Sequence, residues 1–183
     1  LIHLQEDFSK KTGLPHMLDV VGSTPEALRR FLDFAADATD APLLIDGVSG
    51  SVRISGLRHA CEVGLGDRVV YNSISPHASA AELEAVRESG IKSAVLLAFE
   101  PTAFTSKARM EVVRRLLPMA ENSGVEKPLI DVGVLDIPSL GVALRTIQNI
   151  KNEIGFPTGC GAHNAVSTWK GLRRKMGRQA VIP

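Results

Sequence analysis

The chain has 183 residues, of which 44% are apolar, 22% charged and 4% aromatic, and its formal net charge is +1. This composition is typical of one soluble globular domain, and the balanced charge and few aromatic residues argue against a nucleic-acid-binding surface. We also expect no membrane insertion, because no apolar run reaches roughly 18 residues, and a reducing, cytoplasmic location, because Cys61 and Cys160 do not suggest a disulfide framework.

The chain opens on Leu1-Ile2-His3 without a methionine, and residues 1–11 predict an amphipathic helix rather than a signal peptide. We therefore expect this sequence to be part of a longer protein. Beyond this helix, short apolar runs alternate with helical patterns. The predicted strands are residues 17–21, 42–46, 68–72, 93–99, 128–133 and a glycine-rich segment that ends in His163-Asn164.

Helical patterns separate these strands. Ser23-Thr24-Pro25-Glu26 has the spacing of a capping box with an early proline, and Ser79-Ala80-Ala81-Glu82 is a second capping box, whose helix Ser89-Gly90 closes. Further helices are predicted over residues 52–63 and 168–175. Two more are indicated by apolar residues at helical spacing, one by Val113, Leu116 and Leu117 and the other by Ala143, Ile147, Ile150 and Ile154. The tail 177–183 is predicted to begin another strand.

The alternation predicts strand–helix units spaced by about 25–35 residues, as in βαβ folds. Continuous apolar strands indicate a parallel sheet buried on both faces. An open doubly wound sheet and a (β/α)8 barrel both fit, but no strand is followed by a glycine-rich nucleotide-binding fingerprint. We therefore predict an α/β fold, a (β/α)8 TIM barrel forming a single domain over residues 1–183, with the first strand and last units missing from this sequence.

Polar side chains stand where the predicted strands end, and the chemistry of a barrel lies at the carboxyl ends of its strands. These positions are Asp19, Asp46, Asn72 with Ser73, Glu100, Asp131 and Asn164. Turns and helix caps also favour Asp, Asn and Ser, so each single position has that alternative interpretation. Their recurrence at one face favours a site instead. Carboxylates and amides suit a ligand with adjacent N–H donors and acceptors, such as the edge of a pterin.

The glycine-rich stretch 156–167 is the most unusual part of the sequence. Its closely spaced glycines suit close approach of the backbone to a ligand, and the alternative is a tight turn capped by Asn164 or Ser167. We interpret Ser167 as a cap rather than a nucleophile, His163 as a turn-stabilising side chain, and Cys160 as a small buried residue. No metal site is predicted, because the chain lacks clustered cysteines or paired histidines.

Five segments together resemble a known family. They are Met17-Leu18-Asp19-Val20-Val21-Gly22, Leu44-Ile45-Asp46-Gly47, Val70-Tyr71-Asn72-Ser73-Ile74, Leu129-Ile130-Asp131 and Gly159-Cys160-Gly161-Ala162-His163-Asn164. They resemble the H-subunit family of tetrahydromethanopterin S-methyltransferase, which includes bacterial methylcobamide:tetrahydrofolate methyltransferases of glycine betaine metabolism. The last segment and the Phe99-Glu100-Pro101 loop look most like those bacterial enzymes.

The resemblance implies a pterin-binding TIM barrel related to dihydropteroate synthases and to corrinoid iron–sulfur protein methyltransferases. By the order of the strands, Asp46, Asn72 and Asp131 would bind the pterin, and Asn164 would lie near its N5. The implied catalytic residues are Asn164 and Asp131, and the implied substrate-binding residues are Asp19, Asp46, Asn72, Ser73, Asp131 and Asn164.

The resemblance further implies transfer of a methyl group between a corrinoid and N5 of tetrahydrofolate, a reaction that needs positioning more than a protein nucleophile. The chain has no Asp-x-His-x-x-Gly motif, so the corrinoid is expected free or on a separate corrinoid protein. A homodimer is expected. The alternatives are a tetrahydromethanopterin-specific member of the same family, a non-catalytic pterin-binding subunit of a larger complex, and a pterin synthase, which would need a phosphate-binding Lys/Arg set.

Overall fold

The computed structural model describes residues 1–167 and 169–177. Among these residues lies a six-stranded sheet in the order β1-β2-β3-β4-β5-β6, with every neighbouring pair parallel. The strands are β1 (Leu18–Gly22), β2 (Leu43–Gly47), β3 (Val69–Ile74), β4 (Ser93–Leu97), β5 (Lys127–Asp131) and β6 (Thr158–Gly159). The spatial order follows the chain order, as in (β/α) barrels, whereas the order of a doubly wound sheet reverses at a switch point.

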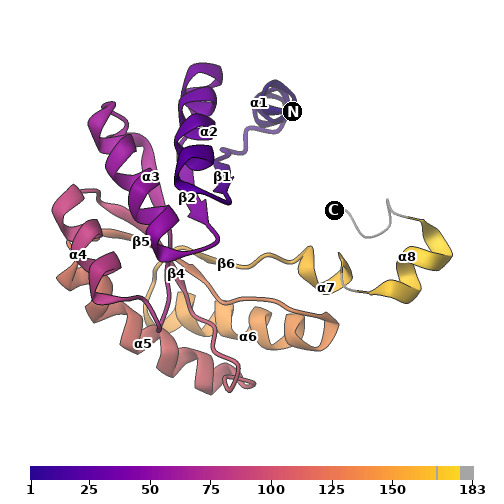
Figure 1. Ribbon diagram of the computed structural model, residues 1–183. Helices are drawn as coiled ribbons and strands as arrows, with labels where there is room; N and C mark the ends of the chain where they lie inside the picture. Colours follow the sequence, from indigo (N-terminus) through magenta and orange to yellow (C-terminus); the bar gives the residue numbers. More distant parts are fainter. Residues whose placement is uncertain (168, 178–183) are drawn as a thin grey trace.

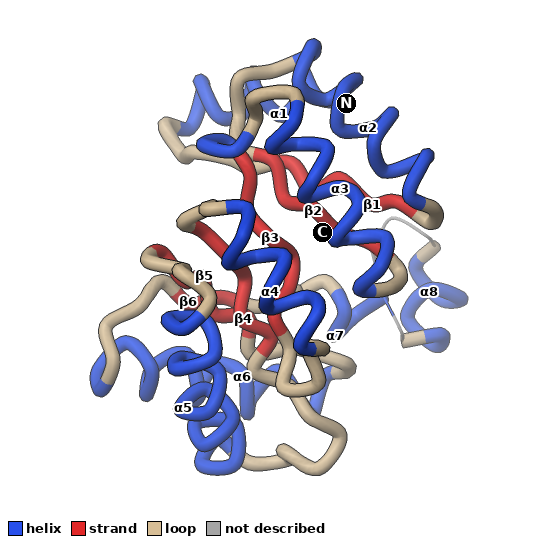
Figure 2. Tube along the Cα trace, turned by 60° about the vertical axis from the view of Figure 1, so that its left-hand side comes forward, coloured by secondary structure: helices blue, strands red, loops and turns tan. Residues whose placement is uncertain are grey.

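Helices connect successive strands and follow one another in an arc outside the sheet (Figure 1). They are α2 (Pro25–Ala38), α3 (Gly50–Glu62), α4 (Ala80–Ser89), α5 (Ser106–Asn122) and α6 (Ile137–Glu153), and a 3-10 turn (Gly66–Arg68) precedes β3. The helix α1 (Ile2–Thr12) comes before the sheet, and α7 (Asn164–Ser167) and α8 (Lys170–Met176) follow it. Figure 2 shows α3 and α4 in front of the strands. The arrangement is consistent with a partial (β/α) barrel.

Helix starts follow the predicted capping chemistry with one correction. Ser79 and Glu82 form the expected capping box at the start of α4, and Gly90 ends that helix with a φ of 70°. The prediction of a capping box from Ser23 to Glu26 was wrong. Thr24 is the N-cap of α2 and its hydroxyl accepts from Ala27 N at 3.2 Å. The reason is Pro25, which fits the first helical position and so makes the preceding residue the cap.

The core lies between the sheet and its layer of helices. Leu43, Ile45 and Tyr71 from the strands are fully buried, as is Leu28 from α2. The backbone of Leu28 lies so close to β1 that a Cβ on Gly22 would come within 2.7 Å of its Cα, so glycine is required there.

In the described residues the opposite face of the sheet is only partly covered, contrary to the prediction that both faces are buried. Val21 is 52% exposed, and Leu44 and Leu129 are half-buried. These side chains alternate with the buried ones along their strands and therefore point away from the helices. In the described residues, Leu44 and Leu129 line a hollow instead of meeting a second packed layer.

The glycine-rich strand is present, but its predicted end at His163-Asn164 was wrong. Only Thr158 and Gly159 pair with β5, and the chain then turns, with Asn164 N donating to Gly161 O at 3.0 Å. Asn164 begins α7 instead of ending a strand. Nor does Ser167 cap the last helix, because Trp169 is the N-cap of α8.

That last helix was predicted over 168–175 and begins at Lys170. Residue 168 and the segment 178–183, which covers most of the expected further strand, lie outside the described residues. Within the described part of the chain, no helix is both long and apolar enough to span a membrane.

Candidate functional site

The inner face of the sheet carries a hollow of about 450 Å³. Its floor is apolar and comes from three strands through Leu44, Val95 and Leu129. Asn72 and Asp131 supply polar groups to the same lining. Small-molecule sites typically enclose about 300–1,000 Å³ and combine an apolar wall with a few polar groups, so this hollow fits that class.

Asp131 is the last residue of β5, as the sequence predicted. Its Oδ1 accepts from Gly133 N at 2.8 Å, and Gly133 adopts a φ of 66° that suits this tight turn. Burial raises the pKa of the Asp131 carboxyl above its ordinary value, although the hydrogen bond from Gly133 and the positive charge of Arg109 oppose that shift. The carboxylate therefore stands at the edge of the hollow, partly desolvated and held in one direction.

Arg109 supports this loop and was missed in the sequence. It lies in α5 with only 2% of its surface exposed. Its Nη1 donates to the carbonyl oxygens of Val132 and Gly133, both at 2.9 Å, and its Nε donates to Ala103 O at 3.2 Å. One guanidinium thus joins the loops that follow β4 and β5. An arginine in a helical pattern normally indicates an exposed position, so the sequence held no signal for this role.

Asp19, Asp46 and Asn72 form a second polar cluster on three adjacent strands. Asn72 Nδ2 donates to Asp19 Oδ1 at 3.2 Å, and Asp46 Oδ1 accepts from Gly47 N at 2.6 Å. Burial raises the pKa of Asp19, while the hydrogen bond from Asn72 opposes this shift and the charge of Asp46 adds to it. Asp46 is the penultimate residue of β2, as predicted for a strand end.

The prediction that Asp19 stands at the end of its strand was wrong. It is the second residue of β1 and pairs with Leu44, so it does not end the strand. The apolar run of this strand continues for three residues beyond it to Gly22. Its carboxylate nevertheless reaches Asn72.

Two further candidates are Ser73 and Asn164. Ser73 follows Asn72 in β3, where the register with β4 shifts between Asn72 and Ile74, and the Asn72–Ser73 peptide bond is cis. Asn164 is half-buried in α7 and is not part of the lining of the hollow, whereas Cys160 is. Cys160, predicted to be a small buried residue, is therefore only partly buried. Burial raises the pKa of its thiol, and the negative charge of Asp131 adds to this shift.

Glu100 does not join the site. Its carboxylate accepts from Arg115 Nη2 at 2.6 Å, which directs it toward α5. His163 is exposed in the turn before α7. Among residues 1–167 and 169–177, no group of three or more His, Cys, Asp or Glu side chains is arranged to hold a metal ion.

The lining of the hollow thus presents the Asp131 carboxylate as an acceptor and the Asn72 amide, which can both donate and accept. Asp19 and Asp46 do not line the hollow but lie next to it, Asp19 through its hydrogen bond with Asn72. A flat heterocycle with adjacent N–H groups and a carbonyl oxygen would satisfy such a set, because a carboxylate can accept two parallel N–H bonds.

Comparison with known proteins places the chain in one family. A family model described as "Tetrahydromethanopterin S-methyltransferase MtrH subunit" matches residues 1–181. The H-subunit of tetrahydromethanopterin S-methyltransferase from Methanothermobacter thermautotrophicus is 41% identical over 182 residues, covering 94% of this chain and 59% of the relative. The H-subunits from Methanopyrus kandleri and Methanosarcina acetivorans are 36% and 33% identical, covering 94% and 95% of this chain and 57% and 58% of their own lengths.

The chain spans less than two thirds of the length of these curated relatives. Their names specify tetrahydromethanopterin, so the closer likeness to the bacterial tetrahydrofolate enzymes stays a prediction. The family itself is confirmed: with its model matched over residues 1–181, the chain belongs to the MtrH family of tetrahydromethanopterin S-methyltransferase subunits.

Proposed function

We propose that this protein binds a tetrahydropterin in the hollow of the sheet and takes part in transferring a methyl group to or from N5 of that pterin. The observation that carries the proposal is the joint presence of Asn72 and Asp131 in one hollow of suitable volume, in a chain of this family. The names of the relatives favour tetrahydromethanopterin as the pterin. Tetrahydrofolate, which the sequence motifs favoured, is the alternative.

The proposed domain is a (β/α)8 TIM barrel, of which residues 1–167 and 169–177 supply six strand–helix units. In such a barrel the hollow on the inner face becomes the interior below the mouth. Binding groups then lie at the carboxyl ends of the strands. Asp46 and Asp131 stand at such ends.

Each site residue has a proposed role. Asp131 and Asp46 accept hydrogen bonds from the N–H groups of the pterin edge, and Asn72 pairs with the adjacent carbonyl or ring N–H. Asp19 holds the Asn72 amide in the observed orientation through their 3.2 Å hydrogen bond. Ser73 completes the binding set beside Asn72.

Asn164 is proposed to act at N5. Methyl departure from N5 requires that this nitrogen gain positive character first, and a placed amide can hold N5 by a hydrogen bond as charge develops. Asp131 is the second proposed catalytic residue, because its carboxylate would fix the orientation of the pterin in which N5 meets the methyl group.

The methyl partner is proposed to be a corrinoid that is free or carried by a separate corrinoid protein. We assign no residue of this chain to holding it. The relatives are named as subunits, which favours work within a protein complex. A homodimer and a cytoplasmic location complete the proposal.

The test is an anaerobic mixture of full-length protein, methylcobalamin and either tetrahydromethanopterin or tetrahydrofolate, followed by the corrinoid spectrum. Conversion to cob(I)alamin that depends on tetrahydromethanopterin and is lost in Asp131→Asn supports the proposal. Conversion with tetrahydrofolate alone moves the substrate to the alternative. Pterin binding without conversion, even with a corrinoid protein supplied, favours a non-catalytic pterin-binding subunit.

A further inference from the structure

Two buried side chains and one half-buried arginine form a polar network behind the site, between the sheet and its helices. Arg53 Nη2 donates to Glu82 Oε1 at 2.5 Å, Tyr71 OH donates to the same oxygen at 2.8 Å, and Arg53 Nε donates to Tyr71 OH at 3.3 Å. Tyr71 is fully buried and Glu82 is 6% exposed. The three residues come from α3, β3 and α4, so the network links a strand to the helices before and after it.

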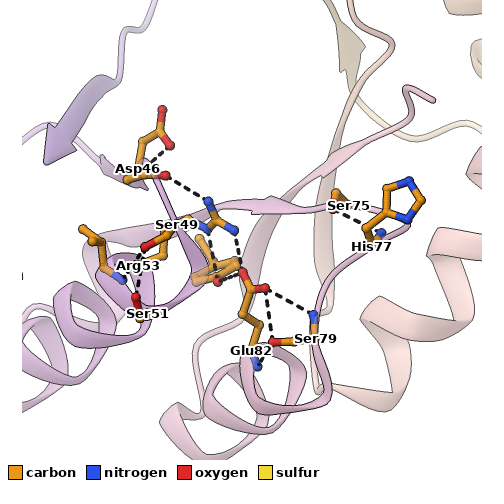
Figure 3. Close-up of polar contacts among 11 residues, drawn as sticks. Asp46, Ser49, Ser51, Arg53, Ser75, His77, Ser79 and Glu82 are labelled. Carbon is orange, nitrogen blue, oxygen red and sulfur yellow. Dashed lines mark hydrogen bonds and ion pairs between the residues drawn. The ribbon is translucent and has the colours of Figure 1, made fainter. Parts of the chain in front are cut away.

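The network is attached to the backbone beside two proposed pterin-binding residues. Arg53 Nη1 donates to Gly47 O at 2.9 Å, and Gly47 follows Asp46 directly. Tyr71 directly precedes Asn72 in β3. Figure 3 shows Arg53 reaching between the Asp46 strand and Glu82. A single guanidinium therefore ties the carboxyl end of β2 to β3 at the height of the site.

Glu82 extends this link to the loop after β3. Its Oε2 accepts from the backbone N of Ser79 at 3.2 Å and from the Ser79 hydroxyl at 3.3 Å, in the capping box that ends the loop. The packing around it leaves no spare room, because a Cβ on Gly50 would lie 2.5 Å from Glu82 Cδ. The loops that follow Asp46 and Asn72 are thus both held by one carboxylate–guanidinium pair.

Such a pair is a poor device for stability alone. Desolvating two charges opposes folding, and apolar residues of similar volume often stabilise a protein as well or better. Burial works against ionisation of Glu82, but the hydrogen bonds from Arg53, Tyr71 and Ser79 outweigh it and hold the pKa of this carboxyl below its ordinary value. What the network provides, and an apolar cluster would not, is a fixed direction for each group that it contacts.

We propose that Arg53, supported by Tyr71 and Glu82, is a positioning residue that holds Asp46 and Asn72 in the geometry that binds the pterin edge. This inference rests on the proposed function. Arg53 does not touch the pterin. It acts through the Gly47 carbonyl on one strand and through Tyr71 on the next.

The chain offers a matched control at the other end of the same two strands. Arg68 Nη2 donates to Thr39 O and, at 3.1 Å, to Ala41 O. It thereby ties the loop before β2 to the start of β3, far along the strands from Asp46 and Asn72. Arg68→Lys and Arg53→Lys each keep the charge but replace the planar fork by one ammonium group, which cannot make the same divergent bonds.

The experiment compares both variants in the full-length protein by thermal unfolding and by titration with tetrahydromethanopterin and tetrahydrofolate. Both should unfold at a lower temperature than the wild type. Arg53→Lys should weaken binding of the accepted pterin by about tenfold, and Arg68→Lys by less than about twofold. Equal affinities of the two variants overturn the inference, whereas a wild type that binds neither pterin overturns the proposed function beneath it.

A double-mutant cycle separates positioning from general loss of stability. Asp46→Asn, Arg53→Lys and the double variant are titrated with the same pterin. If Arg53 acts through Asp46, the double variant loses much less affinity than the product of the single losses, since contacting or coupled residues are non-additive. A double loss equal to that product overturns the inference. Should Arg53→Lys fail to fold, Tyr71→Phe takes its place, because it removes only the hydroxyl that accepts from Arg53.

Discussion

Asp131 is the residue whose ionisation should be visible in binding. Burial raises the pKa of its carboxyl, so protonation begins at a higher pH than for an ordinary aspartate. The pterin N–H groups need the ionised form as acceptor. We therefore expect pterin affinity to be full above this raised pKa and to fall as the pH decreases through it. Asp131→Asn should weaken binding by about 1.5–3 kcal/mol, the value of a hydrogen bond to a charged group, and reduce the pH dependence.

The measurement is a titration of the full-length protein with pterin at several pH values. Asp37→Asn serves as control, because this aspartate is exposed on α2 and should change neither affinity nor slope. If the pH dependence of pterin affinity stays unchanged in Asp131→Asn, another group must titrate. Asp19, whose pKa is also raised by burial, would be the next group to test.

Asn164 should affect the rate more than the binding. It lies outside the lining of the hollow, in the short helix α7. If Asn164 acts at N5, it should therefore contact the pterin only as the reaction proceeds. We expect Asn164→Ala to lower kcat by about tenfold or more and to change pterin affinity by less than about threefold. Steady-state kinetics and titration on the same preparation measure both. An equal loss in rate and affinity would contradict this role, and Asn152→Ala on the exposed side of α6 is the control.

For single residues, the sequence predicted a place in the site only where a polar residue type coincides with the end of an apolar run. Asp131 and Asp46 could be predicted because a polar group after an apolar run signals a strand end. Arg53 and Arg109 could not, because a lone arginine in a helical pattern normally predicts solvent exposure. Their roles depend on which backbone carbonyls the fold brings within reach, and those carbonyls belong to other elements.

Among the elements, the start of α2 gives a direct comparison of two adjacent hydroxyl residues. The sequence favoured Ser23 as the cap, whereas Thr24 accepts the hydrogen bond from Ala27 N. We expect Thr24→Ala to lower the free energy of unfolding by about 0.5–2 kcal/mol, the usual value of an N-cap. Ser23→Ala, at an exposed position outside the helix, should change it by less than about 0.5 kcal/mol.

Chemical denaturation of the two variants measures this difference. The reverse order of stability would place the cap at Ser23 and restore the capping box with Glu26. The comparison matters for the fold because Pro25 alone decided between two caps that both satisfied the sequence pattern.

Strands were harder to bound than helices because they lack such local signals. Five of them could be found from apolar runs alone, with shifts of one or two residues at most ends. The sixth was predicted in the right segment but too long, because Thr158 and Gly159 form a strand only by pairing with Ile130 and Asp131. The backbone beyond them turns at Gly161 and satisfies its hydrogen bonds locally.

For the whole molecule, strand order followed from the repeated strand–helix alternation, since each short connection places the next strand beside the last. The extent to which helices cover each face of the sheet did not follow from the sequence. Val21 and Leu44 have the same apolar character as Val20 and Leu43, yet only the latter pair is buried under helices. Which face meets a helix layer depends on the three-dimensional path of the connections, which an apolar run does not encode.

The contrast between α1 and α5 is the last prediction and concerns how stability is distributed over the molecule. The helix α1 has no buried residue, whereas α5 buries Met110, Val113 and Leu116 against the core. Opening α1 therefore exposes little new apolar surface, and its opening free energy should be far below that of α5. Hydrogen exchange followed by mass spectrometry on the full-length protein should show rapid exchange in α1 and strong protection in α5. Equal protection would contradict this expectation, and would mean that Leu4 and Phe8, each 54% exposed here, are covered in the full-length protein.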